Sequence, residues 1–242
     1  MTQRAIRQTA AYTTMSAERY QRISTFVDLR QADLTVCLEQ VHKPHNVSAI
    51  VRSCDAVGIH TVHSVTRDKD PLRKDTAMGA EDWVFHQSHN SINAAVDYFH
   101  QQDMQVLVTH LDDDAVDFRE IDYTRPTAII LGQEKFGATP QAVALADKKI
   151  VIPMVGMVQS LNVSVAAALV LYEAQRQRQQ AGMYQRAQLS HAQRQLLLFR
   201  GGFPRLYALC EKKGISNPPI DEHGKIVAPA EWWEQVQFSQ TK

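Results

Sequence analysis

The chain has 242 residues and a hydrophobic fraction of 44%, which is enough for one large α/β core with appendages at its ends. Basic and acidic residues balance at 26 each, which argues against a generally basic, histone-like nucleic-acid binder but leaves room for a local basic face. The three cysteines, Cys37, Cys54 and Cys210, are widely separated, which favours a reducing compartment. We find neither an apolar run of about 18 residues nor a secretory leader, so we expect a cytoplasmic protein without a membrane partner.

The N-terminal part divides into a tail and a basic helix. Residues 1–14 are polar and aperiodic, which predicts a disordered tail. Residues 15–33 begin with a suitable N-cap, Ser16, for a helix that continues to Arg30. Apolar residues recur in this helix at spacings of three and four, so its arginines, Arg30 among them, are expected to be mostly exposed.

Strands alternate with helices from residue 34 to residue 181, the segment that we expect to form the core. Stretches rich in β-branched residues predict strands at 34–41, 59–65, 83–85, 104–110, 127–131 and 149–153. Apolar periodicity and glycine stops predict helices at 46–57, 91–102, 140–146 and 161–181. The acidic stretch at 111–125 is predicted to lie on the surface. This alternation is typical of a mostly parallel sheet covered by helices on both faces.

Residues 182–242 change character and predict a helical extension rather than a second sheet domain. Helices are expected at 190–200 and 204–212, before a proline-rich turn and the pair Trp232 and Trp233. The tryptophans suit either packing within this extension or stacking on bases, and packing is the preferred interpretation.

Ligands of parallel sheets bind beyond the carboxyl ends of the strands, where three polar loops are expected. The first leads from His42 to Arg52 with the sequence H-K-P-H-N-V-S-A-I-V-R. A helix start beside an arginine favours a phosphate site in which Asn46 acts from the helix start and Arg52 reaches back. Taken alone, the same residues also suit an N-cap and a surface arginine.

The second loop follows the buried strand at 127–131 and has the sequence L-G-Q-E-K-F-G. Gly132 ends the strand and Glu134 follows two residues later, which suits a tight turn with exposed backbone amides. The stretch matches neither a P-loop nor the dinucleotide fingerprint G-x-G-x-x-G. An ordinary glycine between strand and loop is the alternative interpretation.

The third stretch runs from Ile152 to Glu173 with the sequence I-P-M-V-G-M-V-Q-S-L-N-V-S-V-A-A-A-L-V-L-Y-E. It combines a glycine-containing loop, two methionines and a polar pair, Ser160 and Asn162, at the start of an alanine-rich helix. Such a loop suits a flat aromatic base held by main-chain groups. Helix caps followed by core residues explain this stretch equally well when it is taken alone.

Together, in order and in spacing, the three stretches resemble the signature motifs of the SpoU-type (SPOUT) RNA 2′-O-ribose methyltransferases. Residues 34–46, 116–127 and 171–184 resemble the tRNA-methylating branch, and the similarity covers about residues 16–240. The resemblance implies an α/β fold whose parallel sheet is flanked by helices and carries a deep C-terminal trefoil knot, which no periodicity shows. It also implies a homodimer that uses S-adenosyl-L-methionine to methylate the D-loop guanosine at position 18 of tRNA, with RNA rather than DNA as its partner.

The resemblance also assigns roles to individual residues. The implied catalytic residues are Arg52, Asn46, Glu134, Ser160 and Asn162. The implied contacts to the methyl donor are Thr109, Gly132, Ile152, Met157 and Leu161. Basic residues near both ends fit tRNA phosphates, although each also suits a solvated surface charge. The arginines expected to bind RNA are Arg19, Arg22, Arg30, Arg176 and Arg178.

Methyl transfer requires the ribose 2′-hydroxyl to lose its proton. In the family, the arginine that matches Arg52 is proposed to take part in this deprotonation, but an arginine in a protein is almost always protonated. We prefer an interpretation in which Arg52 binds phosphate and stabilises the developing alkoxide, while the proton leaves by another path. Asn46 would orient Arg52 or the ribose, and the other three polar residues would order the loops and the substrate.

Other interpretations of the sequence remain open. A related enzyme could act on ribosomal RNA or on another tRNA position, and a non-catalytic RNA-binding module could keep the same fold. Intact motif residues favour the enzyme, and the missing glycine fingerprint disfavours a small-molecule Rossmann enzyme. The histidines and the cluster Asp112, Asp113 and Asp114 are better explained without a metal, so none is expected. The segment at 67–82 is more charged than the family's pattern, and substrate selection could differ there.

Overall fold

The structure is a computed structural model that describes residues 13–65 and 79–236. Most of the predicted tail and most of the charged segment at 67–82 lie outside the described residues. Thr14, the last residue of that tail, is paired with Lys225 in an antiparallel bridge. Within the described part of the chain, every helix is too short or too polar to cross a membrane.

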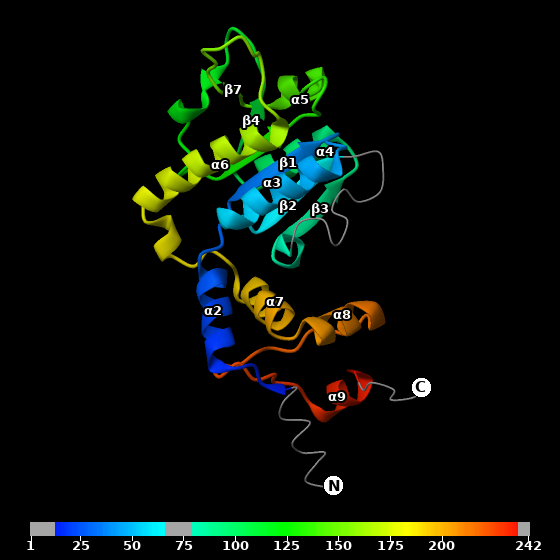
Figure 1. The fold of residues 1–242 in the computed structure, drawn as a ribbon. Coiled ribbons are helices and arrows are strands. Elements are labelled where there is room, and N and C mark those ends of the chain that lie inside the picture. Colours follow the sequence, from blue (N-terminus) through cyan, green and yellow to red (C-terminus); the bar gives the residue numbers. More distant parts are fainter. Residues whose placement is uncertain (1–12, 66–78, 237–242) are drawn as a thin grey trace. The chain divides into compact units, whose positions relative to one another are not determined.

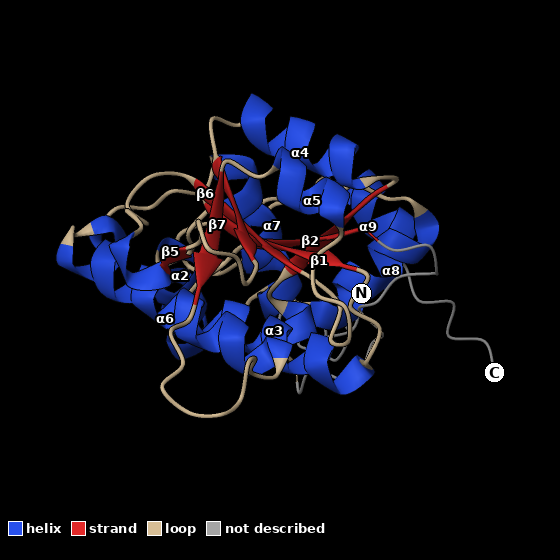
Figure 2. Ribbon diagram, turned by 90° about the horizontal axis from the view of Figure 1, so that it is seen from above, coloured by secondary structure: helices blue, strands red, loops and turns tan. Residues whose placement is uncertain are grey.

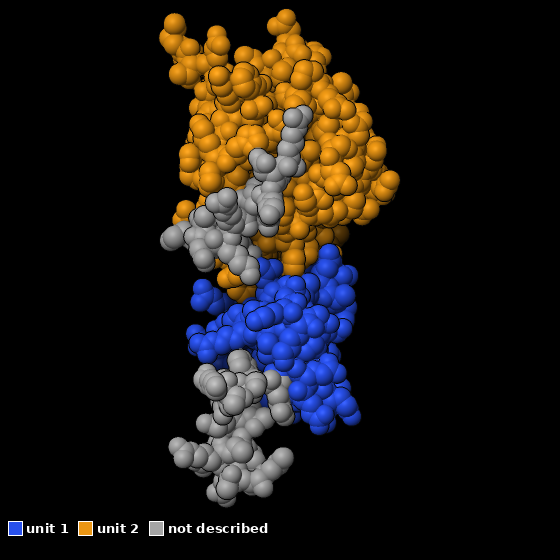
Figure 3. Space-filling model, turned by 90° about the vertical axis from the view of Figure 1, so that its right-hand side faces the viewer, with its two compact units in different colours: residues 1–29, 189–242 blue, residues 30–188 orange. Residues whose placement is uncertain are grey.

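The chain forms two compact units (Figure 3). The larger comprises residues 30–188, and the smaller joins the two ends of the chain, residues 1–29 and 189–242. In the smaller unit α2 (Ala17–Asp28) packs against α7 (His191–Gly202), so the basic N-terminal helix and the C-terminal extension meet there. The sheet belongs entirely to the larger unit.

The larger unit is built on a seven-stranded sheet in which neighbouring strands are parallel (Figure 1). The strand order is β3-β2-β1-β6-β4-β7-β5. The strands are β1 (Leu34–Glu39), β2 (Thr61–Val65), β3 (Phe85–His89), β4 (Gln105–Thr109), β5 (Val116–Asp117), β6 (Thr127–Leu131) and β7 (Lys148–Val151). The predicted parallel sheet is confirmed, because its buried strands carry the continuous apolar runs that this architecture needs.

Two local predictions are wrong. The strand predicted at 83–85 begins later, at Phe85, where β3 starts. A 3-10 turn (Ala80–Asp82) occupies the residues just before it. The stretch at 111–125 is not merely an acidic surface, since it contains β5 and a 3-10 turn. Three of its apolar residues, Phe118, Ile121 and Tyr123, are buried, whereas Leu111 and most of its carboxylates are exposed. A high local charge therefore hid a short piece of core.

Helices cover both faces of the sheet, as predicted (Figure 2). α3 packs with α6 on one face, and α4 packs with α5 on the other. Their bounds are α3 (Pro44–Ala56), α4 (Ile92–Gln101), α5 (Pro140–Leu145) and α6 (Val163–Gln180). The 3-10 turn between β5 and β6 spans Phe118–Glu120, and another follows α6 at Met183–Gln185. One apolar cluster fills each face, and β1 supplies Val36 and Leu38 to one cluster and Cys37 to the other.

Two arginines that were expected to bind RNA, Arg30 and Arg178, are fully buried in the larger unit, so that expectation is wrong for both. Arg30 pairs with Asp55 at 2.5 Å and donates to the backbone carbonyl of Ile59 at 2.6 Å. Arg178 pairs with Asp33 and also donates to three backbone carbonyls. These acidic partners compensate the buried charges. Because the partners lie far away along the sequence, helical periodicity did not reveal that the two arginines are buried.

Replacing Arg178 by alanine is expected to lower the free energy of unfolding by about 3 kcal/mol, because Asp33 and several carbonyls would lose their buried partner. Urea unfolding followed by circular dichroism measures the change. Arg176→Ala is the matched control, since Arg176 lies on the same helix, is 54% exposed and, among the described residues, pairs with neighbours along that helix. Its loss should have a far smaller effect. Equal destabilisation by the two variants would contradict a structural role for Arg178.

The smaller unit is helical, as predicted for the ends of the chain. Besides α2 and α7 it contains α8 (Pro204–Lys213) and α9 (Ala230–Val236). Ser16 caps α2 by accepting from the backbone N–H of Arg19, as predicted. Trp232 is buried, donates to the carbonyl of Ser216 at 2.8 Å and lies edge-on to Phe199. The packing interpretation is therefore confirmed for this tryptophan.

Candidate active site

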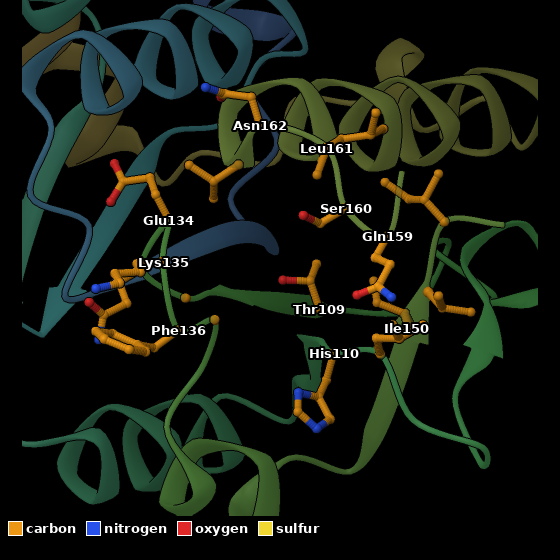
Figure 4. A pocket seen from close by; sticks show the side chains of 18 of the residues that line it. Thr109, His110, Glu134, Lys135, Phe136, Ile150, Gln159, Ser160, Leu161 and Asn162 are labelled. Atoms are coloured by element: carbon orange, nitrogen blue, oxygen red, sulfur yellow. The ribbon is translucent and has the colours of Figure 1, made fainter. Parts of the chain in front are cut away.

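A pocket of about 740 Å³ lies in the larger unit beyond the carboxyl ends of β4, β6 and β7 (Figure 4). Its position is the one that a parallel sheet predicts, and its size is typical of sites for small organic ligands. The lining consists of Lys43, residues 109–111, 132–137, 150–152, Met154, residues 159–163, Ala166 and Val170. All three polar stretches singled out in the sequence thus contribute to one cavity.

Gly132 marks the point where the second loop folds back on itself. A Cβ at this position would lie 2.0 Å from the backbone nitrogen of Ala138 and 2.1 Å from the carbonyl carbon of Gly137. The loop is closed by a hydrogen bond of 2.9 Å from the N–H of Gly137 to the carbonyl of Gln133, and Gly137 adopts a positive φ of 71°. The predicted tight turn is therefore confirmed, and a ligand here meets backbone rather than side chain.

Three of the predicted catalytic residues form one chain of hydrogen bonds. Nδ2 of Asn46 donates to Oε1 of Glu134 at 2.7 Å, and Nδ2 of Asn162 donates to Oδ1 of Asn46 at 3.1 Å. Oδ1 of Asn162 accepts from the backbone N–H of Ser164 at 2.8 Å and so caps α6. Because a backbone N–H can only donate, the Asn162 atom that faces it is the oxygen, and the Asn162 NH2 group faces Asn46. Asn162 therefore donates to the oxygen of Asn46, and the NH2 group of Asn46 donates to Glu134. The chain links the second and third loops to α3.

The carboxyl group of Glu134 is held in its ionised form. Partial burial raises its pKa, but hydrogen bonds from Asn46, from its own backbone N–H and from that of Lys43, together with the charge of Lys43, outweigh burial. The pKa of Glu134 therefore lies below its ordinary value. An ionised carboxylate only accepts hydrogen bonds, which is consistent with the direction of the chain from Asn162 through Asn46.

Asn46 is not the N-cap of α3, so that alternative is wrong. The helix begins at Pro44 with Lys43 as its N-cap, because proline in the first turn needs no partner for a backbone N–H. Asn46 lies in the first turn of the helix and is buried. Among the described residues its side-chain hydrogen bonds go to Glu134 and Asn162, and none goes to Arg52. Asn46 therefore holds the loops together rather than orienting the arginine.

Replacing Asn46 by aspartate is expected to lower the thermal stability near pH 7, because two carboxylates would meet where an amide now donates. Repulsion raises the pKa of one of them, so the lost stability should return as the pH falls towards about 5 and a shared proton restores a hydrogen bond. Thermal unfolding at several pH values measures this. The double variant N46D/E134Q should recover stability at neutral pH, since the glutamine amide can donate; failure to recover would contradict the assigned bond directions.

The other two predicted catalytic residues are placed differently. Ser160 lines the pocket, whereas Arg52 does not and is exposed on α3. The described residues give the Arg52 side chain neither a hydrogen bond nor an ion pair. An exposed guanidinium with unused donors is free to bind a phosphate or a carboxylate from outside the chain. The structure therefore keeps Arg52, which the family resemblance predicts to be catalytic, apart from the Asn46 chain.

Four of the five residues expected to contact the methyl donor line the pocket. They are Thr109, Gly132, Ile152 and Leu161. The fifth, Met157, is not part of the lining, and its side chain is 99% exposed. Met154 from the same loop lines the pocket instead, because the loop turns outward before Met157. The expected contact from Met157 is corrected accordingly.

Sequence reasoning missed several polar residues of the pocket, among them Lys43, His110 and Gln159. His110 follows β4 directly, and Gln159 precedes Ser160, so both stand next to predicted residues at the carboxyl edge of the sheet. That position was the available signal. Lys43 belongs to the first predicted loop, but its place beside Glu134 depends on how the chain between β1 and α3 folds.

The histidines do not form a metal site in the part of the chain described, where no group of three metal-ligating side chains is close enough to hold an ion. His63 and His89 instead form a hydrogen bond of 2.8 Å between ring nitrogens. Burial lowers the pKa of His63 to about 3, with the His89 and His86 charges adding to the effect. Asp112 and Asp114 bind the ammonium group of Lys149 at 2.6 and 2.7 Å.

The SpoU rRNA Methylase family model matches residues 33–172, and the model of the SpoU rRNA methylase C-terminal region matches residues 176–229. The chain belongs to the SpoU methylase family. Among SpoU methylases, the tRNA (guanosine(18)-2′-O)-methyltransferase of Escherichia coli K12 is 55% identical over 226 residues, which cover 92% of this chain and 99% of that protein. The enzyme of the same name from Thermus thermophilus is 51% identical over 172 residues, 71% of this chain and 89% of that one.

Solved structures of SpoU proteins share the fold. The TrmH/SpoU tRNA modifying enzyme of A. aeolicus is 41% identical and has a TM-score of 0.72, covering 77% of this chain and 96% of that chain. The AdoMet-bound rRNA methyltransferase of Sinorhizobium meliloti is 29% identical with a TM-score of 0.53, covering 63% and 59%. The parallel sheet flanked by helices is therefore the fold that the SpoU resemblance predicts.

Proposed function

We propose that this SpoU protein transfers a methyl group from S-adenosyl-L-methionine to the ribose 2′-hydroxyl of guanosine 18 in the D-loop of tRNA. The observation that carries the proposal is 55% identity, over 92% of the chain, to a protein of that name. The site agrees with it, since all five expected catalytic residues are present and three are joined by hydrogen bonds beside the pocket.

The pocket suits S-adenosyl-L-methionine, which supplies an electrophilic methyl group when bound. Apolar side chains, those of Ile150, Ile152 and Leu161, offer walls for a flat adenine ring. The missing side chain at Gly132 lets the loop close tightly on itself, so that main-chain groups of the loop line the pocket. Glu134 lines the same cavity as an ionised carboxylate, which favours a positively charged ligand.

Arg52 binds the phosphate next to the reacting ribose and stabilises the alkoxide that develops on the 2′-oxygen. We give Arg52 no role as the base, because arginines in proteins are almost always protonated, and the proton of the hydroxyl leaves by another path. The chain from Asn162 through Asn46 to Glu134 keeps the pocket loops in one arrangement, which holds donor and acceptor in line. Ser160 contributes a hydroxyl to the lining, where it orders the substrate ribose.

Exposed arginines in both units bind tRNA through its phosphates, without reading sequence. In the smaller unit Arg22 is exposed on α2 and has no partner among the described residues, while Arg19 donates to the carbonyl of Gly201 at 2.7 Å. In the larger unit Arg176 is 54% exposed beside Glu173. The reaction takes place in the cytoplasm, in line with the free thiols of the three cysteines.

The active form is a homodimer in which a second copy covers an apolar stripe on α6. Val165, Leu169 and Tyr172 recur at helical spacing and are 47%, 42% and 52% exposed. The loop leading into this helix adds Val155 and Met157, whose side chains are fully exposed. Leu169→Glu should convert a dimer, measured by light scattering after gel filtration, into a monomer. A monomeric wild-type protein would reject this arrangement.

The chain between β7 and α6 belongs to a deep trefoil knot. Support comes from the SpoU family and from the path of the chain. The loops 132–137 and 152–162 line one pocket, and the second connects β7 with a helix that packs on α3. Single-molecule pulling from both termini should therefore give an unfolded length shorter than the contour length, because a tightened knot retains residues. Full extension would contradict the knot.

Methyl transfer from labelled S-adenosyl-L-methionine tests the proposed function. Unmodified tRNA transcripts and 23S rRNA transcripts are offered separately, and the modified nucleotide is mapped. Label on the ribose of guanosine 18 is the expected result. Label on rRNA alone would keep the chemistry and replace the substrate, a possibility raised by 39% identity over 150 residues to a 23S rRNA (guanosine-2′-O-)-methyltransferase RlmB. Donor binding without transfer to any RNA would favour a non-catalytic RNA-binding protein.

A further inference from the structure

The pocket loop after β6 has to be held at both of its ends. Its first end is Gly132, directly after the central strand, and its other end is Thr139, where α5 begins. Gly132 packs directly against the backbone of Ala138, the residue before Thr139, which leaves no room for a side chain at Gly132. Whatever fixes Thr139 therefore also fixes the backbone that lines the pocket at Gly132.

Glu39 holds Thr139 from the neighbouring strand. Its Oε2 accepts from the backbone N–H of Thr139 at 2.9 Å, and its Oε1 accepts from the Thr139 hydroxyl at 2.5 Å. Glu39 ends β1, which pairs with β6 up to the register of Leu38 with Leu131, so the carboxylate starts from the strand next to the loop. Both oxygens of one carboxylate are thus used on one residue, 100 positions along the chain.

The contact between Glu39 and Thr139 is buried, unlike an ion pair or hydrogen bond at the surface. Glu39 is only 2% exposed, and a buried carboxylate is retained only where hydrogen bonds compensate its lost hydration. The Thr139 hydroxyl donates to Glu39 and at the same time accepts from the backbone N–H of Ala142 at 3.1 Å. Its rotamer is therefore fixed from two sides, and the loop end is fixed relative to both β1 and α5.

We propose that Glu39 is a positioning residue for the methyl-donor pocket, acting through Thr139 on the loop from Gly132 to Ala138. Glu39 is not part of the pocket lining, so it does not touch the ligand. It sets the shape of the backbone that does. Loss of this tether lets the loop end move away from Gly132 and weakens donor binding, whereas the exposed arginines that serve RNA are unaffected. The inference depends on the proposed function only through the identity of the methyl donor.

Calorimetric titration of the full-length protein with S-adenosyl-L-methionine tests the proposal without any RNA. Glu39→Gln and Thr139→Val should each weaken donor binding about tenfold or more, because each disrupts the pair of hydrogen bonds between Glu39 and Thr139. Thr139→Ser keeps the hydroxyl and should bind within about twofold of the wild type. The double variant should bind the donor no more weakly than the more affected of the two single variants, since both changes break the same contact.

Kinetics separates positioning from a general loss of structure. The KM for the donor should rise in Thr139→Val while kcat at saturating donor and the affinity for unmodified tRNA stay close to wild type. Unchanged donor affinity in a folded Thr139→Val protein would overturn the proposal, and so would additive effects of the two changes. If Glu39→Gln does not fold, the affinity of Thr139→Val alone tests the proposal. A wild-type protein that fails to bind the donor would overturn the proposed function itself.

Discussion

Replacing Arg52 by alanine is expected to slow methyl transfer by about a hundredfold to a thousandfold while leaving donor binding unchanged. Besides binding the phosphate, the guanidinium stabilises the charge that develops as the 2′-oxygen loses its proton. Its removal should therefore lower kcat and leave the KM for the donor unchanged. Single-turnover transfer to a tRNA transcript measures the effect. The protein should stay folded, because Arg52 is exposed and its side chain has no partner among the described residues.

Arg186→Ala is the matched control for that experiment. Arg186 is also an exposed arginine of the larger unit, and it is not part of the pocket lining. Its replacement removes the same charge from the tRNA-binding protein and should alter transfer only slightly. Arg52→Lys adds a second comparison, since lysine keeps the charge but not the planar fork of donors. Equal activity of Arg52→Ala and the control would contradict the catalytic role of Arg52.

Replacing Gly132 by alanine is expected to abolish donor binding. The new methyl group would lie 2.0 Å from the backbone nitrogen of Ala138, a distance at which the loop has to move. The atom that is struck belongs to the backbone, so no rotamer change relieves the clash. We expect at least about a hundredfold weaker binding of S-adenosyl-L-methionine by calorimetry and a lower melting temperature.

Gly156→Ala provides the control for the same change in the other loop. A Cβ at Gly156 meets nothing within 4 Å, so this variant should bind the donor like the wild type. Comparing the two variants distinguishes the effect of replacing any loop glycine from the effect of the clash with Ala138 at Gly132. Wild-type affinity in Gly132→Ala would show that the backbone of this loop does not shape the donor site.

The sequence predicted the sheet and the place of the pocket because both depend on local patterns. Buried parallel strands read as short apolar runs, and the loops at their carboxyl ends carry the polar motifs. Residues 127–131 illustrate this, since the predicted strand is the observed one and Gly132 follows it into the pocket. The roles of single residues came from the family resemblance and not from these patterns.

Contacts between distant residues were beyond what local patterns show. Asn46 meets Glu134 and Asn162 across 88 and 116 positions, and no spacing in the sequence links them. Arg178 was expected to bind RNA as one of the basic residues near the chain's ends, yet it is buried, and Asp33, 145 positions away, compensates its charge. A charged residue is placed by its partner, and the partner becomes visible only in the folded chain.

Replacing guanosine 18 of a tRNA transcript by 2′-deoxyguanosine tests the central claim most directly. The two RNAs then differ in one oxygen atom, the proposed nucleophile, and should bind the protein with similar affinity. The account predicts that the unsubstituted transcript accepts one methyl group from S-adenosyl-L-methionine and that the deoxy transcript accepts none. Undiminished transfer to the deoxy transcript would place the reaction at another atom or another nucleotide and contradict the account.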